Sequence, residues 1–233
     1  MEEEERKLKK AAAILMVMTM TAGLAACGSE SSSDGSGSGD DPGKYVIGIC
    51  QQMEHPSLDD ATAGFQDACK ELFGEDNVEF DVQNAQGEQT MCSTIMNNFV
   101  SSDVDLILAN ATLPLQTAAQ ATADIPLLGT SVPNYGAALD IDDWTGTTGV
   151  NISGTSDLAP ISEQEDVMME LLPDVKTVGI LYCSAESNSK YQAEMFEKEL
   201  EEDGVDYKEY TAADSNEIQS VVTSAVQEVD AIY

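Results

Sequence analysis

The 233-residue chain carries 43 acidic and 10 basic residues, for a formal net charge of -33, and 42% of it is hydrophobic. This apolar content can build a core and excludes a wholly disordered chain. With Arg6 as the only arginine and few lysines, the chain lacks the clustered positive charge that a nucleic-acid partner requires. The same scarcity predicts that backbone N–H groups and hydroxyls would hold any bound carboxylate.

The N-terminus, residues 1–26, is predicted to be an export signal. Three lysines within residues 7–10 precede the apolar run AAAILMVMTMTAGLAA, which is short for a membrane span and rich in alanine at its end. The motif LAAC at residues 24–27 resembles the lipobox of bacterial lipoproteins and implies cleavage before Cys27, with a lipid on its sulfur. The acidic start MEEEE is unusual for such a signal, and a start codon placed too early would explain it. A buried apolar helix is the alternative, but small residues and a cysteine close the run.

A Gly/Ser/Asp tether follows the cysteine. The segment SESSSDGSGSGDDPG, residues 29–43, has no periodicity and no apolar residue to bury. Together with the lipobox, it predicts a folded body that a lipid anchor holds at the extracytoplasmic face of the bacterial cell membrane. The predicted organisation is a signal peptide at 1–26, a lipidated cysteine and tether at 27–43, an N-terminal α/β lobe at 44–155 and a second α/β lobe at 156–233.

Beyond the tether, short apolar runs alternate with segments of helical period, which is typical of βαβ units and a mostly parallel sheet. Helix boundaries are indicated at Ser57, a candidate N-cap, at Pro114 and Pro160, which suit a first turn, and at Gly204, which suits a helix end. The predicted strands are 45–50, 78–83, 104–109, 125–129, 147–151, 176–182, 207–211 and 229–233.

An internal repeat accompanies this alternation. The order YVIGIC, GFQDACKELF, FDVQNAQGEQ, VDLILA in the first half is echoed by TVGILYC, AEMFEKELEEDG, YKEYTAADSNEIQ, VDAIY in the second. Each half opens with a strand that carries a central glycine, Gly48 or Gly179. Two similar α/β lobes are therefore expected, with chance similarity of two β-α-β-α-β segments as the alternative. Since the second half stops at Tyr233, inside its third predicted strand, we expect the chain to be the front part of a longer protein.

Five polar loops are expected at the carboxyl ends of the strands. In open parallel sheets, ligands bind there because helix N-termini offer free N–H groups. A crossover at residues 151–160 would place the loops of the two lobes on opposing faces of a cleft. Loops rich in Ser, Thr, Asn and Gln suit a small polar or zwitterionic solute, although such residues also cap helices in any protein. The five are QQMEHPS (51–57), NATLP (110–114), TSVPN (130–134), SAESNS (184–189) and AADSN (212–216).

Enzyme and metal sites are weakly indicated. The sequence has no nucleophile elbow, no P-loop and no G-x-G-x-x-G after its first strand. His55, the only histidine, could pair with Ser57, but Pro56 stiffens the turn between them and no third group is indicated. One histidine cannot supply a zinc set, and DIDDW at 140–144 lacks the glycine and distal glutamate of a calcium loop. We therefore predict no catalytic residue, no metal and no cofactor.

Four cysteines follow Cys27, namely Cys50, Cys69, Cys92 and Cys183. Their even number and the predicted compartment permit disulfides, but the spacings select no pairs. Buried free thiols are the simpler expectation, and the redox state stays open.

Several segments together resemble one family: EHPSLDDATAGFQDACKELFG (54–74), NAQGE (84–88), VDLILANATLPLQ (104–116), NISGTSDLAP (151–160), LLPDVKTVGILYCSAESNS (171–189) and DSNEIQ (214–219). Through them, residues 44–233 resemble the substrate-binding lipoproteins of ABC importers of the tryptophan/tyrosine-type group. The resemblance implies an α/β, type I periplasmic-binding-protein fold, with two Rossmann-like lobes on parallel sheets and a second lobe incomplete at the C-terminus. The ligand-binding residues that it implies are Gln52, His55, Ser57, Ala111, Thr112, Ser131, Ser156, Asp157, Glu186, Ser187, Asn188, Ser189, Ser215 and Asn216.

The expected function is capture of a small-molecule solute, an amino acid with aromatic ones among the candidates, for delivery to an ABC permease. The expected membrane contact is through the lipid anchor only, and His55 is expected to line the solute cleft and to catalyse nothing. One rival is a ligand-sensing lipoprotein of the same fold that signals to a membrane receptor. Another is an exported enzyme. A cytoplasmic repressor of similar fold is excluded by the lipobox and by the missing helix-turn-helix.

Overall fold

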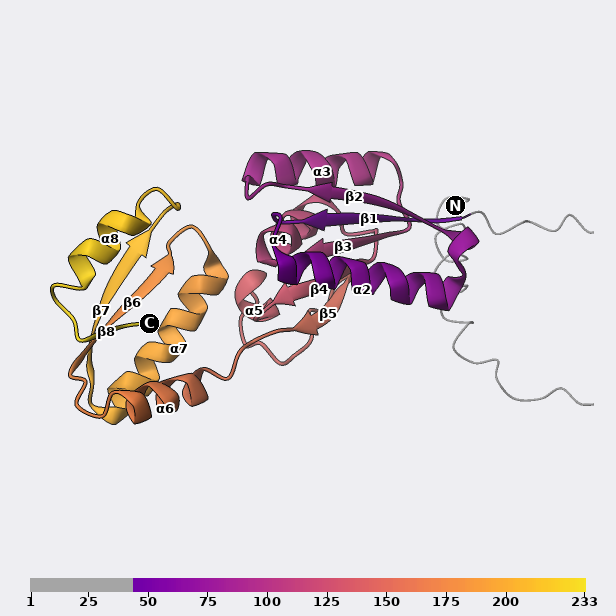
Figure 1. The fold of residues 1–233 in the computed structure, drawn as a ribbon. Coiled ribbons are helices and arrows are strands. Elements are labelled where there is room, and N and C mark those ends of the chain that lie inside the picture. Colours follow the sequence, from indigo (N-terminus) through magenta and orange to yellow (C-terminus); the bar gives the residue numbers. More distant parts are fainter. Residues whose placement is uncertain (1–43) are drawn as a thin grey trace, which may run out of the picture. The chain divides into compact units, whose positions relative to one another are not determined.

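Two parallel β-sheets organise residues 44–233, the part of the chain that the computed structural model describes (Figure 1). The predicted signal peptide, Cys27 and the tether lie outside these residues. None of the helices within residues 44–233 combines the length and the apolar character needed to cross a bilayer. The predicted α/β class, with a parallel sheet in each lobe, is confirmed.

The first sheet has five parallel strands in the order β2-β1-β3-β4-β5. Its central strands form from the most apolar runs, because strands buried on both faces need apolar residues at nearly every position. Its elements are β1 (Tyr45–Gln51), α2 (Pro56–Phe73), η2 (Glu75–Asn77), β2 (Val78–Asn84), α3 (Gln89–Ser101), β3 (Leu106–Asn110), α4 (Thr112–Ala121), β4 (Leu127–Val132), α5 (Tyr135–Ala138) and β5 (Ile152–Ser156).

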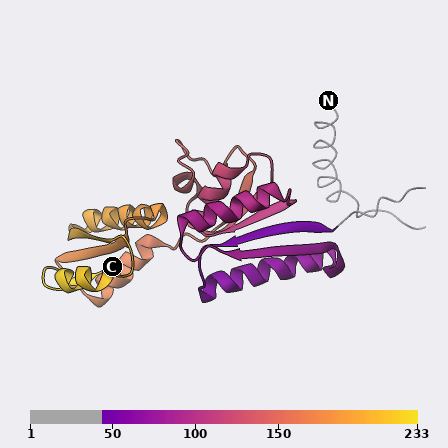
Figure 2. The same ribbon diagram turned by 90° about the horizontal axis from the view of Figure 1, so that it is seen from above.

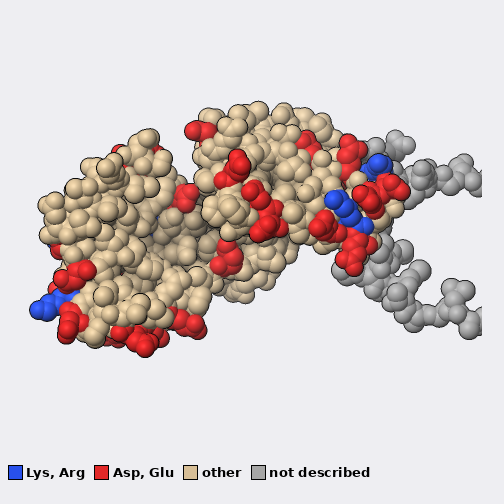
Figure 3. All heavy atoms as spheres, in the orientation of Figure 1, with Lys and Arg blue, Asp and Glu red and all other residues tan. Residues whose placement is uncertain are grey.

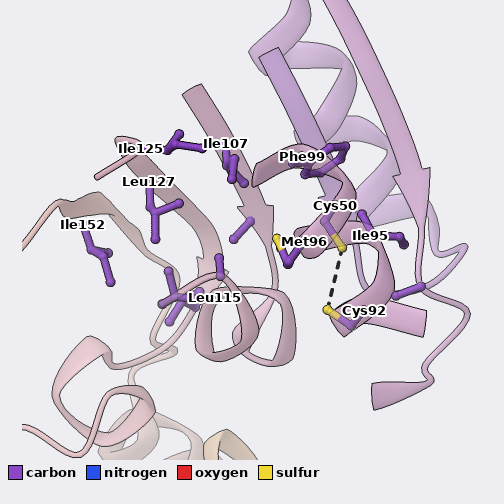
Figure 4. Close-up of a cluster of buried hydrophobic side chains, with 14 of the residues drawn as sticks. Cys50, Cys92, Ile95, Met96, Phe99, Ile107, Leu115, Ile125, Leu127 and Ile152 are labelled. Atoms are coloured by element: carbon purple, nitrogen blue, oxygen red, sulfur yellow. Dashed lines mark hydrogen bonds between the residues drawn. The ribbon is translucent and has the colours of Figure 1, made fainter. Parts of the chain in front are cut away.

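Helices cover both faces of this sheet (Figure 2). On one face, Ile47 and Ile49 of β1 pack in a cluster that includes Cys69 of α2. On the other face, Cys50 and residues of β3 and β4 pack against α3 and α4, where Phe99 is buried (Figure 4). Successive residues of β1 therefore serve opposite faces, as the period of a strand requires.

The second sheet has three parallel strands in the order β7-β6-β8. Val178 and Ile180 of β6 pack in a core with Phe196 and Leu200 of α7. The ring of Tyr233 stacks on Phe196, with 3.6 Å between the ring centroids. Its elements are α6 (Ile161–Leu171), β6 (Thr177–Cys183), α7 (Ser187–Asp203), β7 (Asp206–Ala212), α8 (Ile218–Ala225) and β8 (Ala231–Ile232).

One predicted strand is displaced along the chain. The sequence predicted a strand at 147–151, but the structure has bends there and forms β5 from Ile152 onward. Gly146 and Gly149 adopt φ angles of 88° and 72°, which belong to turns and not to strands. The strand can therefore begin only after these two glycines.

Helix ends also correct the prediction. Ser57 was predicted as an N-cap but lies inside α2, and His55 with its extended backbone holds the cap position. Pro56 takes the first helical position, where its fixed φ fits and its missing N–H costs nothing. Pro160 was predicted in a first turn and is the N-cap residue of α6 instead. Gly204 ends α7 with a left-handed φ of 71°, as predicted.

Candidate functional site

Parallel pairing brings four strand ends of the first sheet to one edge. Gln51 of β1 pairs with Asn110 of β3, and Asn110 pairs in turn with Thr130 of β4. Val132, at the end of β4, pairs with Ser156 at the end of β5. The loops that follow β1, β3, β4 and β5 therefore leave the sheet side by side, which is the edge where parallel sheets bind ligands.

His55 lies exposed at this edge, at the start of α2. Its Nδ1 accepts a hydrogen bond from the Ser57 N–H at 3.3 Å, so the ring caps the helix. An accepting Nδ1 leaves the proton on Nε2, which is then free to donate to a ligand. No group of three or more His, Cys, Asp or Glu side chains within residues 44–233 is arranged to hold a metal ion.

A buried polar network lies beneath the loop that contains His55. Thr62 donates through Oγ1 to Gln51 Oε1 at 2.7 Å, and Gln51 Nε2 donates to Asp59 Oδ1 at 2.6 Å. Asn110 Nδ2 donates to Thr62 Oγ1 at 3.0 Å and to the Leu58 carbonyl at 2.8 Å. These bonds fix the start of α2 to the ends of β1 and β3. The sequence did not predict this network. The only sign of it in the sequence is a polar residue at the end of each of two buried strands, Gln51 in β1 and Asn110 in β3.

The loop after β3 is held in an uncommon backbone conformation. Ala111 has φ 105° and ψ 170°, which an alanine adopts only at a cost of about 1–3 kcal/mol. Its N–H donates to the Thr130 carbonyl at 3.0 Å, which continues the ladder past the strand end. Thr112 is buried and begins α4, whose first N–H groups have no partner within the helix. This backbone conformation of Ala111 turns the chain so that α4 begins at the sheet edge.

The side chain of Tyr135 packs at the junction of β4 and β5. The register shifts after Gly129, and Ser131 beside the shift has a left-handed φ of 57°. Tyr135 is buried, and its hydroxyl donates to the Thr155 carbonyl at 3.1 Å. A Cβ added to Gly154 would fall on the Tyr135 hydroxyl oxygen, so the ring requires a glycine there. Tyr135 thus positions the ends of both strands.

Ser156 and Asp157 lie at the end of β5. The Ser156 hydroxyl donates to the Pro133 carbonyl at 2.7 Å, and the Asp157 N–H donates to the Val132 carbonyl at 3.4 Å. Burial raises the pKa of Tyr135 to about 12, and the Asp157 carboxylate adds to this shift. Partial burial also raises the pKa of Asp157 above its usual value. The Asp157 side chain is exposed at the strand end, where its carboxylate can pair with a cationic group.

Predicted residues after β6 accept hydrogen bonds from side chains of the loop after β1 and of helix α4. Gln52 Nε2 donates to Glu186 Oε1 at 3.1 Å, and the Ser189 hydroxyl donates to Glu186 Oε2 at 3.2 Å. Gln116 Nε2 donates to the Ser187 hydroxyl oxygen at 3.1 Å. Gln52, Glu186, Ser187 and Ser189 are therefore brought together, and Glu186 has a partner in each sheet's loops.

Three predicted residues remain. Asn188 lies between Ser187 and Ser189 in the chain, whereas Ser215 and Asn216 lie apart from this group. Asn188 is half-buried in the first turn of α7, where its carbonyl accepts from Gln192. Ser215 and Asn216 are exposed in the turn before α8, and the Asn216 N–H bonds only locally, to Asp214 at 2.7 Å. No hydrogen bond between described residues joins Ser215 or Asn216 to the loops of the first sheet.

Two surface hollows lie near the strand ends. The first, of about 430 Å³, is lined by Asn134, Trp144 and neighbouring residues, together with Tyr191 of α7. The second, of about 290 Å³, lies beside Gln51 and Asn84 on the α2 side of the sheet. Neither of the two is lined by any of the predicted binding residues. Each hollow does include one residue of the five predicted loops, Asn134 in the first and Gln51 in the second, so both hollows adjoin the candidate site.

The candidate site contains no lysine or arginine. None of the five loops carries a lysine or an arginine, and Figure 3 shows acidic side chains over the face in view with few Lys or Arg side chains. The lysine next to the 184–189 loop, Lys190, pairs with Glu194 at 3.7 Å. Binding of an anionic group here must therefore use N–H groups and hydroxyls.

The chain is similar to known proteins in sequence and in fold. A family model described as ABC transporter substrate binding protein matches residues 46–233. A tyrosine-binding protein of Clostridioides difficile (strain R20291) is 34% identical over 189 residues, which are 80% of this chain and 54% of that protein. The chain thus spans about half the length of this curated relative.

Two solved structures resemble the chain over most of its length. One, from Streptococcus pneumonia, is titled as the ABC domain in complex with L-Trp; it is 35% identical, with a TM-score of 0.76, over 81% of this chain and 64% of that one. The other is a conserved domain protein from Vibrio cholerae, 30% identical with a TM-score of 0.76, over 82% of this chain and 64% of that one.

Proposed function

Because the chain belongs to the family of ABC transporter substrate-binding proteins and has the type I periplasmic-binding-protein architecture, we propose that it is the solute receptor of an ABC importer for an aromatic amino acid. In this proposal Cys27 carries a lipid that anchors the protein at the extracytoplasmic face of the membrane. The residues up to Gly43 form the tether. The lobes 44–155 and 156–233 close on the solute and deliver it to a permease.

The observation that carries the proposal is the set of hydroxyl-rich, lysine-free loops at the carboxyl edge of the strands. A free amino acid presents a carboxylate and an ammonium group, which need different partners. The N-terminus of α4 at Thr112 and the hydroxyl of Ser131 suit the carboxylate, because the helix end offers N–H groups and a partial positive charge. Asp157 and Glu186 suit the ammonium group, because both carboxylates lie at the loops.

The aromatic class of the solute is supported by two relatives above 30% identity. One is named for tyrosine binding, and the other was solved with L-Trp. In this chain the exposed ring of His55 is the group proposed to stack on the solute, with its Nε2–H free to donate. The other proposed contacts are Gln52, Ser57, Ala111, Ser156, Ser187, Asn188, Ser189, Ser215 and Asn216.

A thermal-shift screen on the protein made from its full gene tests the solute. Tryptophan, tyrosine and phenylalanine are compared with leucine, isoleucine and glucose. A solute at a thousand times its Kd should raise Tm on the order of 10 °C for a protein of this size. A shift with glucose alone would contradict the amino-acid proposal, whereas a shift with leucine alone would contradict only the aromatic class.

Matched variants test the site. Asp157→Asn should lower the affinity for the solute at least tenfold, because the proposed partner of the ammonium group loses its charge. Asp76→Asn, on the exposed turn before β2, is the control and should leave the affinity unchanged. Equal affinities of both variants would exclude Asp157 from the site.

Uptake separates transport from sensing. Deletion of the gene should abolish uptake of the solute by the cell. If uptake persists while a transcriptional response to the solute is lost, the protein is a sensor and not an import receptor.

A further inference from the structure

Two cysteines face each other in the core of the first sheet. Cys50 lies in β1 and Cys92 in the first turn of α3, with their Sγ atoms 3.7 Å apart (Figure 4). Both side chains are 0% exposed. The proposed solute site uses neither thiol.

We propose that Cys50 and Cys92 are a modification site, at which oxidation by a low-molecular-weight disulfide forms an intramolecular disulfide that joins β1 to α3. A disulfide needs an S–S distance of about 2.05 Å, so the two sulfurs must approach each other further. Cys92 lies on the first turn of α3, and its N–H donates to the Glu88 carbonyl. A movement of Cys92 toward Cys50 therefore disturbs only the hydrogen bonds of this first turn. A helix end adapts in this way more readily than a central strand does.

The placement of the other thiols leaves this pair without a competitor among the described residues. Cys69 belongs to the cluster on the opposite face of the first sheet. Cys183 lies at the end of β6 in the second sheet. Neither cysteine shares the cluster that contains Cys50 and Cys92.

In the closed core, a hydrogen bond joins the two thiols. Hydrogen bonding from Cys50, with a smaller contribution from Thr117, lowers the pKa of Cys92 to about 7. The same bond and burial raise the pKa of Cys50. Cys92 lies on the helical turn whose opening admits the oxidant, so its thiolate attacks one sulfur of the oxidant and displaces its other half as a thiol.

Cys50 completes the exchange. Its sulfur loses a proton and attacks Cys92 Sγ in the mixed disulfide, which releases the second thiol of the oxidant. In sum, two protein thiols lose two hydrogens and two electrons, and one small disulfide is reduced to two thiols. The inference uses the proposed extracytoplasmic location only for the supply of this oxidant, so it stands or falls independently of the solute.

Burial determines when the reaction occurs. A small disulfide cannot reach sulfurs that are 0% exposed, so the exchange takes place before α3 docks or when its first turn opens. The product closes a loop between residues 42 positions apart. Such a cross-link should raise Tm on the order of 10 °C for a protein of this size.

Refolding in defined redox buffers tests the proposal. The protein made from its full gene, with every cysteine except Cys50 and Cys92 changed to Ala, is refolded with oxidised or with reduced glutathione. We expect the oxidised sample to be monomeric, to lack free thiols after denaturation, and to melt on the order of 10 °C higher. Addition of dithiothreitol should remove the difference.

The matched control retains Cys69 and Cys92 and carries Cys50→Ala. It should keep both thiols, because these two lie on opposite faces of the sheet. Free thiols in the oxidised test chain, dimers linked between chains, a disulfide in the control, or a disulfide that lowers Tm would each overturn the proposal.

A second measurement needs no substitution in the core. The unaltered protein made from its full gene is refolded with oxidised glutathione, alkylated and digested after Glu and Lys residues. Cleavage at Glu54 separates Cys50 from Cys69, so mass spectrometry identifies which cysteine is joined to Cys92. A Cys50–Cys92 peptide supports the proposal, and any other pairing or none contradicts it.

Discussion

The two sheets begin with the same sequence pattern but differ in packing. In the first sheet, β1 is buried from Ile47 to Gln51, and helices cover both faces. In the second sheet, the matching central strand β6 is buried only from Val178 to Ile180. Similar runs of apolar residues therefore predict the type of an element, whereas the neighbours of that element decide how tightly it packs.

The glycines at the centre of β1 and β6 give the largest test of this comparison. A Cβ on Gly48 would lie 2.8 Å from ring carbons of Phe99, which is itself buried. A Cβ on Gly179 would lie 3.1 Å from side-chain atoms of Tyr210 and Val229, which are only partly buried and can yield. Gly48→Ala should therefore cost about 3 kcal/mol of unfolding free energy, and Gly179→Ala less than about 1 kcal/mol.

Urea denaturation measures both variants, and amide exchange of β1 and β6 shows which sheet is weakened. Equal losses for the two glycines would mean that the second core is as rigid as the first.

The buried network of the first sheet provides the next largest effect. Thr62→Val keeps the shape but leaves Gln51 Oε1 without its donor and removes one acceptor from Asn110. The expected loss is about 2 kcal/mol. Thr223→Val in α8 removes a hydroxyl that bonds only within its exposed helix and should change stability by less than about 0.5 kcal/mol. A loss for Thr223→Val that equals the loss for Thr62→Val would contradict the contrast.

Substitution of Glu165, in helix α6 beside the second sheet, is expected to raise stability and not to lower it. Glu165 is buried in α6, its Oε1 has no partner among the described residues, and burial and the charges of Asp203, Asp166 and Glu199 raise its pKa above the usual 4.5. The ionised form is therefore disfavoured when folded, and Glu165→Gln should raise the unfolding free energy at pH 7 by about 1 kcal/mol.

The pH dependence checks the cause of this gain. Above the folded pKa both states ionise and the penalty is complete, so the advantage of Glu165→Gln is largest there. It should disappear as the pH falls through the folded pKa to below 4.5, where both states are protonated. Glu163→Gln, at an exposed site of the same helix, is the control and should show no such profile.

The smallest expected effect lies in α2. A Cβ on Gly64 would meet no atom within 4 Å, and the residue is exposed within a helix. Gly64→Ala should raise the unfolding free energy by about 0.5 kcal/mol, because it removes backbone freedom from the unfolded chain. A loss in urea denaturation would show that the tightness of the first sheet extends to the outer face of α2.

Much of the fold was predictable because burial of strands leaves a local signal. Seven of the predicted strands overlap the observed ones, since apolar runs such as YVIGIC have few alternatives. The exception was β5, whose sequence, ISGTS, is polar and whose pairing with β4 depends on Gly154 and Tyr135. That dependence is a contact between distant residues, so no local pattern carried it.

The sequence predicted which loops form the candidate site but not which side chains contact one another there. Parallel pairing follows from the βαβ pattern, and it implies that strand-end loops meet at one edge. The bond from Gln52 to Glu186, the cap by His55 and the strain at Ala111 require coordinates. The binding role of the individual predicted residues remains a prediction.

Trp144 gives the protein a built-in spectroscopic probe. It is the only tryptophan in the chain, it packs against Gly136, and it lines the larger hollow together with Tyr191. Its indole emission therefore comes from one place, near the loops that carry the proposed solute contacts. A shift in emission when tyrosine or phenylalanine is added would report binding without any label.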